Sequence, residues 1–251
     1  MPHIDLNCDL GESFGAYTIG MDEKVIPFIT SANVACGFHA GDPLVMQRTV
    51  ALCKQSSAAV GAHPGFPDLQ GFGRRQMKLT PAEAKACVQY QIGALKAFCD
   101  AAGVPLHHVK PHGALYNMAG KDRALADAIC AAVKESAPGA VLLALSGSEM
   151  VKAAQAIGLP VANEVFADRG YRPDGSLVPR GTPGAMIEDE DEAIARVIRM
   201  VTEGKVTAND GTDIAIQANS VCVHGDGPKA LAFVEKIGAA LQAAGVELKA
   251  F

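Results

Sequence analysis

Side chains that can transfer protons, stabilise an oxyanion or bind a metal ion recur in this sequence directly after short apolar runs. The clearest are Asp9, His39, His63, Lys110 and His112, each beside one or more glycines. Any one of them considered alone is most simply a turn or capping residue. Because the same arrangement follows one apolar run after another, we predict that these five residues form a catalytic site with general acid/base chemistry.

Proline stands next to several of these groups and restricts where their side chains point. The segments are His63-Pro64-Gly65 and Lys110-Pro111-His112-Gly113. Rigid placement favours acid/base catalysis, which needs a reach of about 3 Å to the transferred proton. A buried Lys110 either has a lowered pKa or pairs with Asp9 or Glu12 as a fixed charge, and the sequence leaves both open.

A divalent metal ion is a second use for the same groups. One carboxylate and two imidazoles, here Asp9, His39 and His63, are a common catalytic ligand set with positions left open for water. No H-x-x-H spacing places two rings on one element. The sequence therefore leaves the requirement for a metal undecided.

Clustered cations mark a candidate anion site. The segment Gly71-Phe72-Gly73-Arg74-Arg75 places two guanidinium groups beside glycines, which suits bidentate capture of a carboxylate or phosphate by Arg74 or Arg75. Residues 225–230 match G-x-G-x-x-A before an expected helix and form a second, weaker anion cradle. No G-x-x-x-x-G-K-[ST] motif occurs, so the chain by itself is not expected to be an ATPase.

Composition excludes several classes of protein. Lys and Arg number 22 against 27 Asp and Glu, a net charge of −5 with no basic segment, so no nucleic-acid partner is expected. No apolar run reaches the roughly 20 residues of a membrane helix, and the charged start is unlike a signal peptide, so the expected location is the cytoplasm, with no membrane partner. The seven cysteines contain no C-x-x-C pair and are typical of reduced core residues.

Short apolar runs alternate along the chain with longer segments of helical periodicity, and these elements must position the groups named above. Expected strands cover residues 3–8, 31–36, 58–63, 106–111, 140–145, 160–166 and 219–224. Expected helices cover residues 22–29, 43–56, 81–102, 121–136, 148–157, 189–203 and 228–244. Thr80, Pro81 and Glu83 form a capping-box helix start.

Seven such units without a linker predict one domain, residues 1–251, folded as a seven-stranded (β/α) TIM-like barrel. An open doubly wound sheet is the alternative. Either architecture gathers the polar strand ends, with His224 and Asp226 after the last strand, at one edge.

Eight segments carry a resemblance over essentially the whole chain. They are IDLNCDLGE (4–12), ANVACGFHAGD (32–42), GAHPGFPD (61–68), GFGRR (71–75), VKPHGALYN (109–117), EVFADRGY (164–171), LVPR (177–180) and VCVHGD (221–226). Together they resemble the LamB/YcsF lactam-utilisation family, which supplies one subunit of the prokaryotic ATP-dependent 5-oxoprolinase. The resemblance implies a barrel similar to the glycoside hydrolase/deacetylase superfamily.

The same resemblance implies a complex with two other subunits that opens the lactam 5-oxo-L-proline to L-glutamate, with ATP as co-substrate of the complex. The missing nucleotide motif agrees with activation by the partners. On that basis the partners deliver an activated lactam and this chain adds water to it. Whether the chain also forms a homo-oligomer is left open by the sequence.

Roles for the site residues follow from this hypothesis. One of Asp9, His39 or His63 acts as base on the water, while Lys110 and His112 stabilise the oxyanion or protonate the departing nitrogen. An arginine of the 74/75 pair holds the substrate carboxylate. The remaining predicted substrate-binding residues are Asn7, Glu12, Asn33, Asp42 and Asn117.

Two alternatives belong to other classes of function. The first is a metal-dependent deacetylase or amidohydrolase that acts without ATP, with Asp9, His39 and His63 as ligands. The second is a carbohydrate or amino-acid binding module. Aromatic residues make up 5% with no Trp, which leaves few stacking platforms and disfavours a sugar binder.

Overall fold

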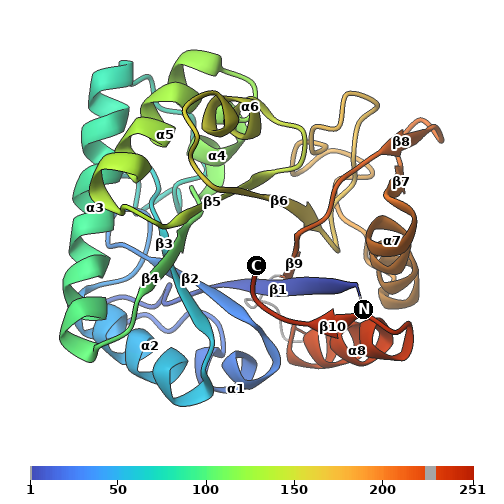
Figure 1. The fold of residues 1–251 in the computed structure, drawn as a ribbon, viewed down its shortest axis with the longest axis horizontal. Coiled ribbons are helices and arrows are strands. Elements are labelled where there is room, and N and C mark those ends of the chain that lie inside the picture. The colour runs from blue at the N-terminus through green and yellow to red at the C-terminus, as the bar shows by residue number, and fades with distance from the viewer. Residues whose placement is uncertain (1, 224–229) are drawn as a thin grey trace.

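Seven parallel strands close into a ring in the computed structural model of this chain, which describes residues 2–223 and 230–251 (Figure 1). In order around the ring they are β1 (His3–Leu10), β2 (Ser31–Ala35), β3 (Ala59–His63), β4 (Leu106–Val109), β5 (Val141–Leu145), β6 (Val161–Phe166) and β9 (Ser220–Val223). Strand β9 pairs with both β6 and β1, which closes the sheet. The predicted (β/α) barrel is thereby confirmed, and the open doubly wound sheet is wrong.

Helices cover the outside of the ring. They are α1 (Asp22–Val25), α2 (Pro43–Ser56), α3 (Pro81–Ala102), α4 (Gly113–Ala119), α5 (Arg123–Ser136), α6 (Glu149–Ala156), α7 (Glu190–Glu203) and α8 (Ala230–Ala243). The expected helix at 22–29 is split into α1 and a 3-10 turn, η1 (Ile26–Phe28), where Pro27 cannot donate a backbone hydrogen bond. Helix α4 was not predicted, because its two turns are too short to show an amphipathic period.

Three short strands also escaped prediction. Strands β7 (Lys205–Thr207) and β8 (Asp213–Ala215) form an antiparallel hairpin, and β10 (Glu247–Leu248) pairs with the start of β1. Of the predicted anion cradle at 225–230, residues 225–229 lie outside the described residues. His224, the polar residue predicted after the last strand, lies outside them as well, and so does Asp226 within the cradle. Among the helices that the structure describes, none has the length and apolar character that a membrane span requires.

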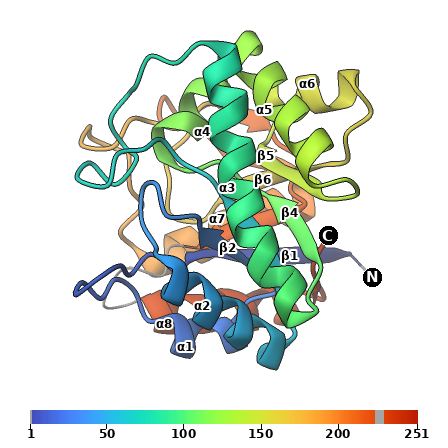
Figure 2. The same cartoon turned by 90° about the vertical axis from the view of Figure 1, so that its left-hand side faces the viewer.

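Helix starts follow the capping chemistry in the sequence. The Asp42 carboxylate accepts from the backbone N–H of Val45 and caps α2. At the start of α3, Thr80 and Glu83 bond reciprocally to each other's backbone N–H groups, which confirms the predicted capping box. Each cap ends a loop that begins at the carboxyl end of a strand, so it also fixes the path of that loop. Figure 2 shows long loops on one side of the barrel and both chain ends on the other.

The ring interior contains a polar layer beneath the site. Asn33 on β2 donates to Asn7 Oδ1 on β1 at 2.8 Å, and its own Oδ1 lies 2.7 Å from His108 Nε2 on β4. Strands β2 and β4 are not neighbours, so this second contact crosses the interior past Gly61 of β3. Cysteines pack in the same core, as predicted. Burial raises the pKa of the Cys36 thiol to about 12.

Gly61→Ala is expected to destabilise the barrel by about 1–3 kcal/mol, because a Cβ there would overlap the fully buried His108 ring. The matched control is Gly93→Ala in α3, where an added Cβ meets nothing within 4 Å. That control should stabilise the fold by roughly 0.5–1 kcal/mol through helix propensity. Urea unfolding measures both variants, and an unchanged midpoint for Gly61→Ala would contradict the close packing inferred here.

Candidate active site

Ends of four successive strands bring all five predicted catalytic residues to one place at the carboxyl side of the ring. Asp9 lies near the end of β1, and His39 lies in the loop between β2 and α2. His63 is the last residue of β3, Lys110 directly follows β4, and His112 directly precedes α4. The convergence arises because parallel strands of a barrel end on the same rim.

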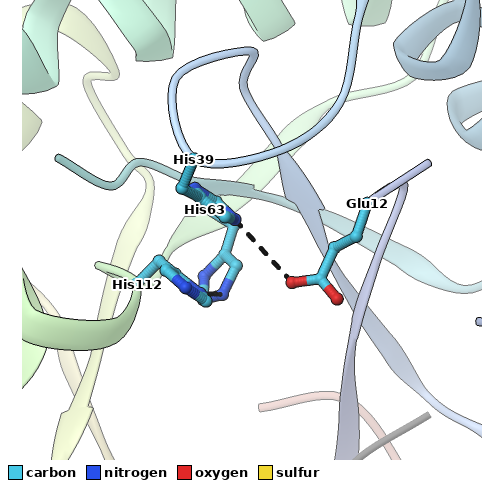
Figure 3. A group of neighbouring side chains, drawn as sticks. All are labelled: Glu12, His39, His63 and His112. Atoms are coloured by element: carbon cyan, nitrogen blue, oxygen red, sulfur yellow. Dashed lines mark hydrogen bonds and ion pairs between the residues drawn. The ribbon is translucent and has the colours of Figure 1, made fainter. Parts of the chain in front are cut away.

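Three imidazoles pack into one cluster with a carboxylate at its edge (Figure 3). The rings of His39 and His112 stack with centroids 3.7 Å apart and planes 3° from parallel. His63 meets His112 edge-on, with His63 Nε2 2.9 Å from His112 Nδ1. Glu12 Oε1 lies 3.7 Å from His39 Nε2. Figure 3 shows these four side chains pointing toward one another from different strand ends and loops.

Backbone carbonyls determine which ring nitrogens carry protons. His63 Nδ1 lies 2.7 Å from the carbonyl oxygen of Lys110, and His112 Nε2 lies 2.8 Å from that of Phe72. A carbonyl oxygen only accepts, so both of these nitrogens are N–H donors. Burial lowers the pKa of His112 to about 3, and burial also lowers the pKa of His39 well below its usual value. Both rings are therefore neutral at neutral pH.

Glycines around the cluster allow the backbone to approach the rings. A Cβ on Gly73 would lie 2.8 Å from His39 Cβ and 2.9 Å from His112 Cδ2. A Cβ on Gly65 would lie 2.7 Å from His39 Nδ1. Glycine at these positions is required by close packing against the imidazoles and not by loop flexibility alone.

Lys110 is a buried ammonium at the floor of the site. Its Nζ lies 2.9 Å from Asp9 Oδ1 and 2.7 Å from Glu164 Oε1, and it donates to Asn7 Oδ1 at 3.2 Å. Burial by itself would lower the pKa of Lys110, but the carboxylates of Asp9 and Glu164 raise it well above its usual value. Of the two states left open by the sequence, the structure therefore selects the fixed charge, paired with Asp9.

Glu164 was not among the predicted site residues. It lies on β6, is fully buried, and accepts from the hydroxyl of Tyr116 at 2.6 Å. Its signal in the sequence is a carboxylate inside the apolar strand VANEVF, since a charge at such a position needs a partner. That partner is Lys110, 54 positions earlier in the sequence.

Two predicted substrate-binding residues lie beneath the site and not at its surface. Asn33 donates to Asp9 Oδ1 at 2.9 Å and to Asn7, while Asn7 donates to Ser220 at 2.6 Å. Both asparagines are fully buried. Asn33 thus holds Asp9 directly, and Asn7 holds Asn33.

The remaining predicted binding residues occupy different positions. Arg74 lines the cleft with its guanidinium 4.9 Å above the Phe72 ring, and Asn117 lines the same cleft from α4. Arg75 instead forms an ion pair with Asp68. Asp42 caps α2 and also accepts from the N–H of Gly15 at 2.9 Å. The structure therefore favours Arg74 over Arg75 as the anion-binding arginine.

A cleft of about 1430 Å³ opens over the site. At its inner end it is lined by Asp9, Glu12, His63, Lys110 and His112. Its lining also includes the cations Lys121, from the turn between α4 and α5, Lys152, from α6, and Arg172 and Arg180, from the loop after β6. The volume exceeds the 300–1,000 Å³ typical of a small-molecule pocket, so there is room for more than a five-membered ring.

Comparison with known proteins agrees with the motifs and the barrel. The LamB/YcsF family profile matches residues 4–251. A relative from Clostridium beijerinckii, named as a subunit of 5-oxoprolinase, is 63% identical over 248 residues, covering 99% of this chain and 97% of that protein. A solved lactam utilization protein from Thermus thermophilus is 51% identical with a TM-score of 0.94, covering 99% of this chain and 100% of that one.

A more distant solved structure shares the fold alone. The family 4 carbohydrate esterase from Streptomyces lividans is 11% identical with a TM-score of 0.52, covering 98% of this chain and 91% of that one. This agrees with the predicted barrel fold. The profile match and the identity over nearly the full length show that the chain belongs to the LamB/YcsF family.

Proposed function

We propose that this chain is the subunit of an ATP-dependent 5-oxoprolinase that carries the ring-opening step, a hydrolysis of the cyclic amide bond of 5-oxo-L-proline to give L-glutamate. The observation that carries the proposal is the floor of the cleft, where Asp9, the Lys110 ammonium and three imidazoles meet. The name of the relative from Clostridium beijerinckii supports the substrate class. Two further subunits are its partners, and ATP binds to them.

The chemistry of the lactam indicates which step belongs to the partner subunits and which to this chain. An unstrained five-membered amide resists hydrolysis, so phosphorylation of its carbonyl oxygen by the partners makes the carbon electrophilic. Water then adds to that carbon, and the C–N bond breaks as the nitrogen takes a proton, which gives γ-glutamyl phosphate. A second water releases inorganic phosphate from this acyl phosphate and leaves L-glutamate. The size of the cleft and the cations that line it suit a lactam that arrives carrying a phosphate.

Asp9 is the base that takes the proton from water. Its Oδ1 is held by Lys110 Nζ and Asn33 Nδ2, both at 2.9 Å, which leaves Oδ2 directed toward the imidazoles, 3.3 Å from His63 Nε2. This positions the carboxylate and keeps it ionised beside a permanent positive charge. Lys110 is thus a positioning residue for Asp9, and its charge stabilises the negative charge that develops on the attacking oxygen.

Arg74→Ala is expected to raise the KM for 5-oxoproline by about tenfold or more, with a smaller effect on kcat, since losing a charge-assisted contact costs about 1.5–3 kcal/mol. Arg74 lines the cleft and is the member of the 74/75 pair that the substrate carboxylate can reach, since Arg75 pairs with Asp68. The control is Arg48→Ala, an exposed residue of α2 that pairs with Glu23. Steady-state kinetics of the assembled complex measure both, and an unchanged KM for Arg74→Ala would remove Arg74 from substrate binding.

The proposed function is tested by coexpressing the three subunits and assaying ATP-dependent glutamate release with each subunit omitted in turn. Glutamate is expected only when all three are present. Glutamate release by the isolated chain without ATP would instead support the metal-dependent amidohydrolase. Full activity of the other two subunits without this chain would contradict its role in ring opening.

A further inference from the structure

Four donor residues form a group that the reaction described above does not fully use. Glu12, His39, His63 and His112 each offer one ligand atom, and these atoms all lie within 4.8 Å of one another. The four residues come from four separate loops or strand ends, and all are buried. Folding therefore concentrates three imidazoles and a carboxylate in one small space where water has little access.

His39 is the clearest sign that something else occupies this space. Its ring is fully buried, and within the described part of the chain neither Nδ1 nor Nε2 has a hydrogen-bond partner. The nearest carboxylate oxygen, Glu12 Oε1, is 3.7 Å from Nε2, which is too long for a hydrogen bond. A buried ring with both nitrogens unsatisfied costs free energy unless a ligand binds it.

His63 and His112 have the arrangement of metal-bound imidazoles. A ligating histidine commonly donates its second ring N–H to a backbone carbonyl, which fixes its tautomer and orientation. His63 Nδ1 donates in this way to Lys110, and His112 Nε2 donates to Phe72. The other two nitrogens, His63 Nε2 and His112 Nδ1, lie 2.9 Å apart. In the neutral rings each of them carries a lone pair, and a cation beside them would be bound by both.

We propose that Glu12, His39, His63 and His112 bind one divalent transition-metal ion of the zinc type. Imidazole nitrogens and a single carboxylate are donors that this class of ion prefers, whereas Mg²⁺ and Ca²⁺ take oxygen ligands. Asp9, grouped with His39 and His63 in the sequence-based ligand set, is held by Lys110 and Asn33 and stands beside this group as the base. The ligand carboxylate is that of Glu12.

The test measures metal uptake by the full chain alone, without partner subunits, substrate or ATP. Chelator-treated protein is titrated with Zn²⁺ against a chromophoric chelator, and Co²⁺ binding is followed by visible absorption. We expect one equivalent to bind. His39→Ala and Glu12→Gln should each weaken binding by at least about 100-fold, while His3→Ala, a histidine exposed at the far end of β1, should bind as the parent does.

Circular dichroism and thermal unfolding of each variant show whether it is folded, and Glu12→Gln preserves side-chain volume if His39→Ala does not fold. Zn²⁺ binding by the parent no tighter than by both cluster variants would overturn the proposal, as would equal weakening in His3→Ala. Because no turnover is measured, failure of metal binding leaves the proposed ring opening untouched, and failure of ring opening leaves the metal site untouched.

Discussion

Asp9→Asn is expected to lower the kcat of the assembled complex for glutamate formation by about 10²–10⁴-fold, the usual contribution of a general base. The asparagine has the same shape, and one side-chain atom can still contact Lys110 and Asn33 as Asp9 Oδ1 does. What it lacks is a basic oxygen at the position of Oδ2, which faces His63. The loss should therefore appear in kcat, with KM for 5-oxoproline changed much less.

The matched control is Asp100→Asn, an exposed carboxylate of α3 that pairs with Lys96 on the surface of the barrel. Size-exclusion chromatography of each variant with the partner subunits shows that assembly is intact. Turnover of Asp9→Asn close to that of the parent complex would show that another group takes the proton from water.

Lys110→Met is expected to cost about 3–5 kcal/mol of unfolding free energy, the typical result of leaving a buried charge without its partner. Lys110 is almost fully buried between the carboxylates of Asp9 and Glu164, and methionine fills a similar volume without the charge. The two acids would then repel each other in a site with little water. Urea unfolding of the isolated chain measures the loss, and glutamate formation should fall with it.

A second variant separates charge from packing. Adding Glu164→Gln to Lys110→Met removes one of the two uncompensated charges, so part of the lost stability should return. Lys96→Met serves as the surface control, because its exposed pair with Asp100 is worth about 1 kcal/mol or less. If the double variant is no more stable than Lys110→Met, the loss arises from packing and the electrostatic account is wrong.

Most of the fold could be predicted because its signals are local. The apolar runs mark the strands to within two residues wherever the structure describes both ends, and Asp42 and Thr80 mark the starts of α2 and α3. The elements that were missed, α4, β7, β8 and β10, are too short to show a period. Closure of the ring was inferred from the number of βα units. In the structure the ring closes because β1 pairs with β9.

The sequence predicted which residues gather at the site, but not which of them interact with one another. Parallel strands end on the same rim, so polar residues after the strands were expected to meet, and Asp9, His39, His63, Lys110 and His112 do. Which groups pair could not be deduced. Arg75 was a candidate for the substrate but pairs with Asp68, and Asp42 was another but caps a helix.

The sequence by itself determined the family, the order of strands and helices, and the set of side chains available for chemistry, because motifs, periodicity and caps act between residues a few positions apart. Only the tertiary structure decided that Lys110 is a fixed charge between Asp9 and Glu164, and that Glu12 joins three histidines. Those outcomes depend on distances of a few ångströms between residues separated by 24 to over 100 positions, and on the burial that sets their charge states. No spacing along the chain encodes either quantity.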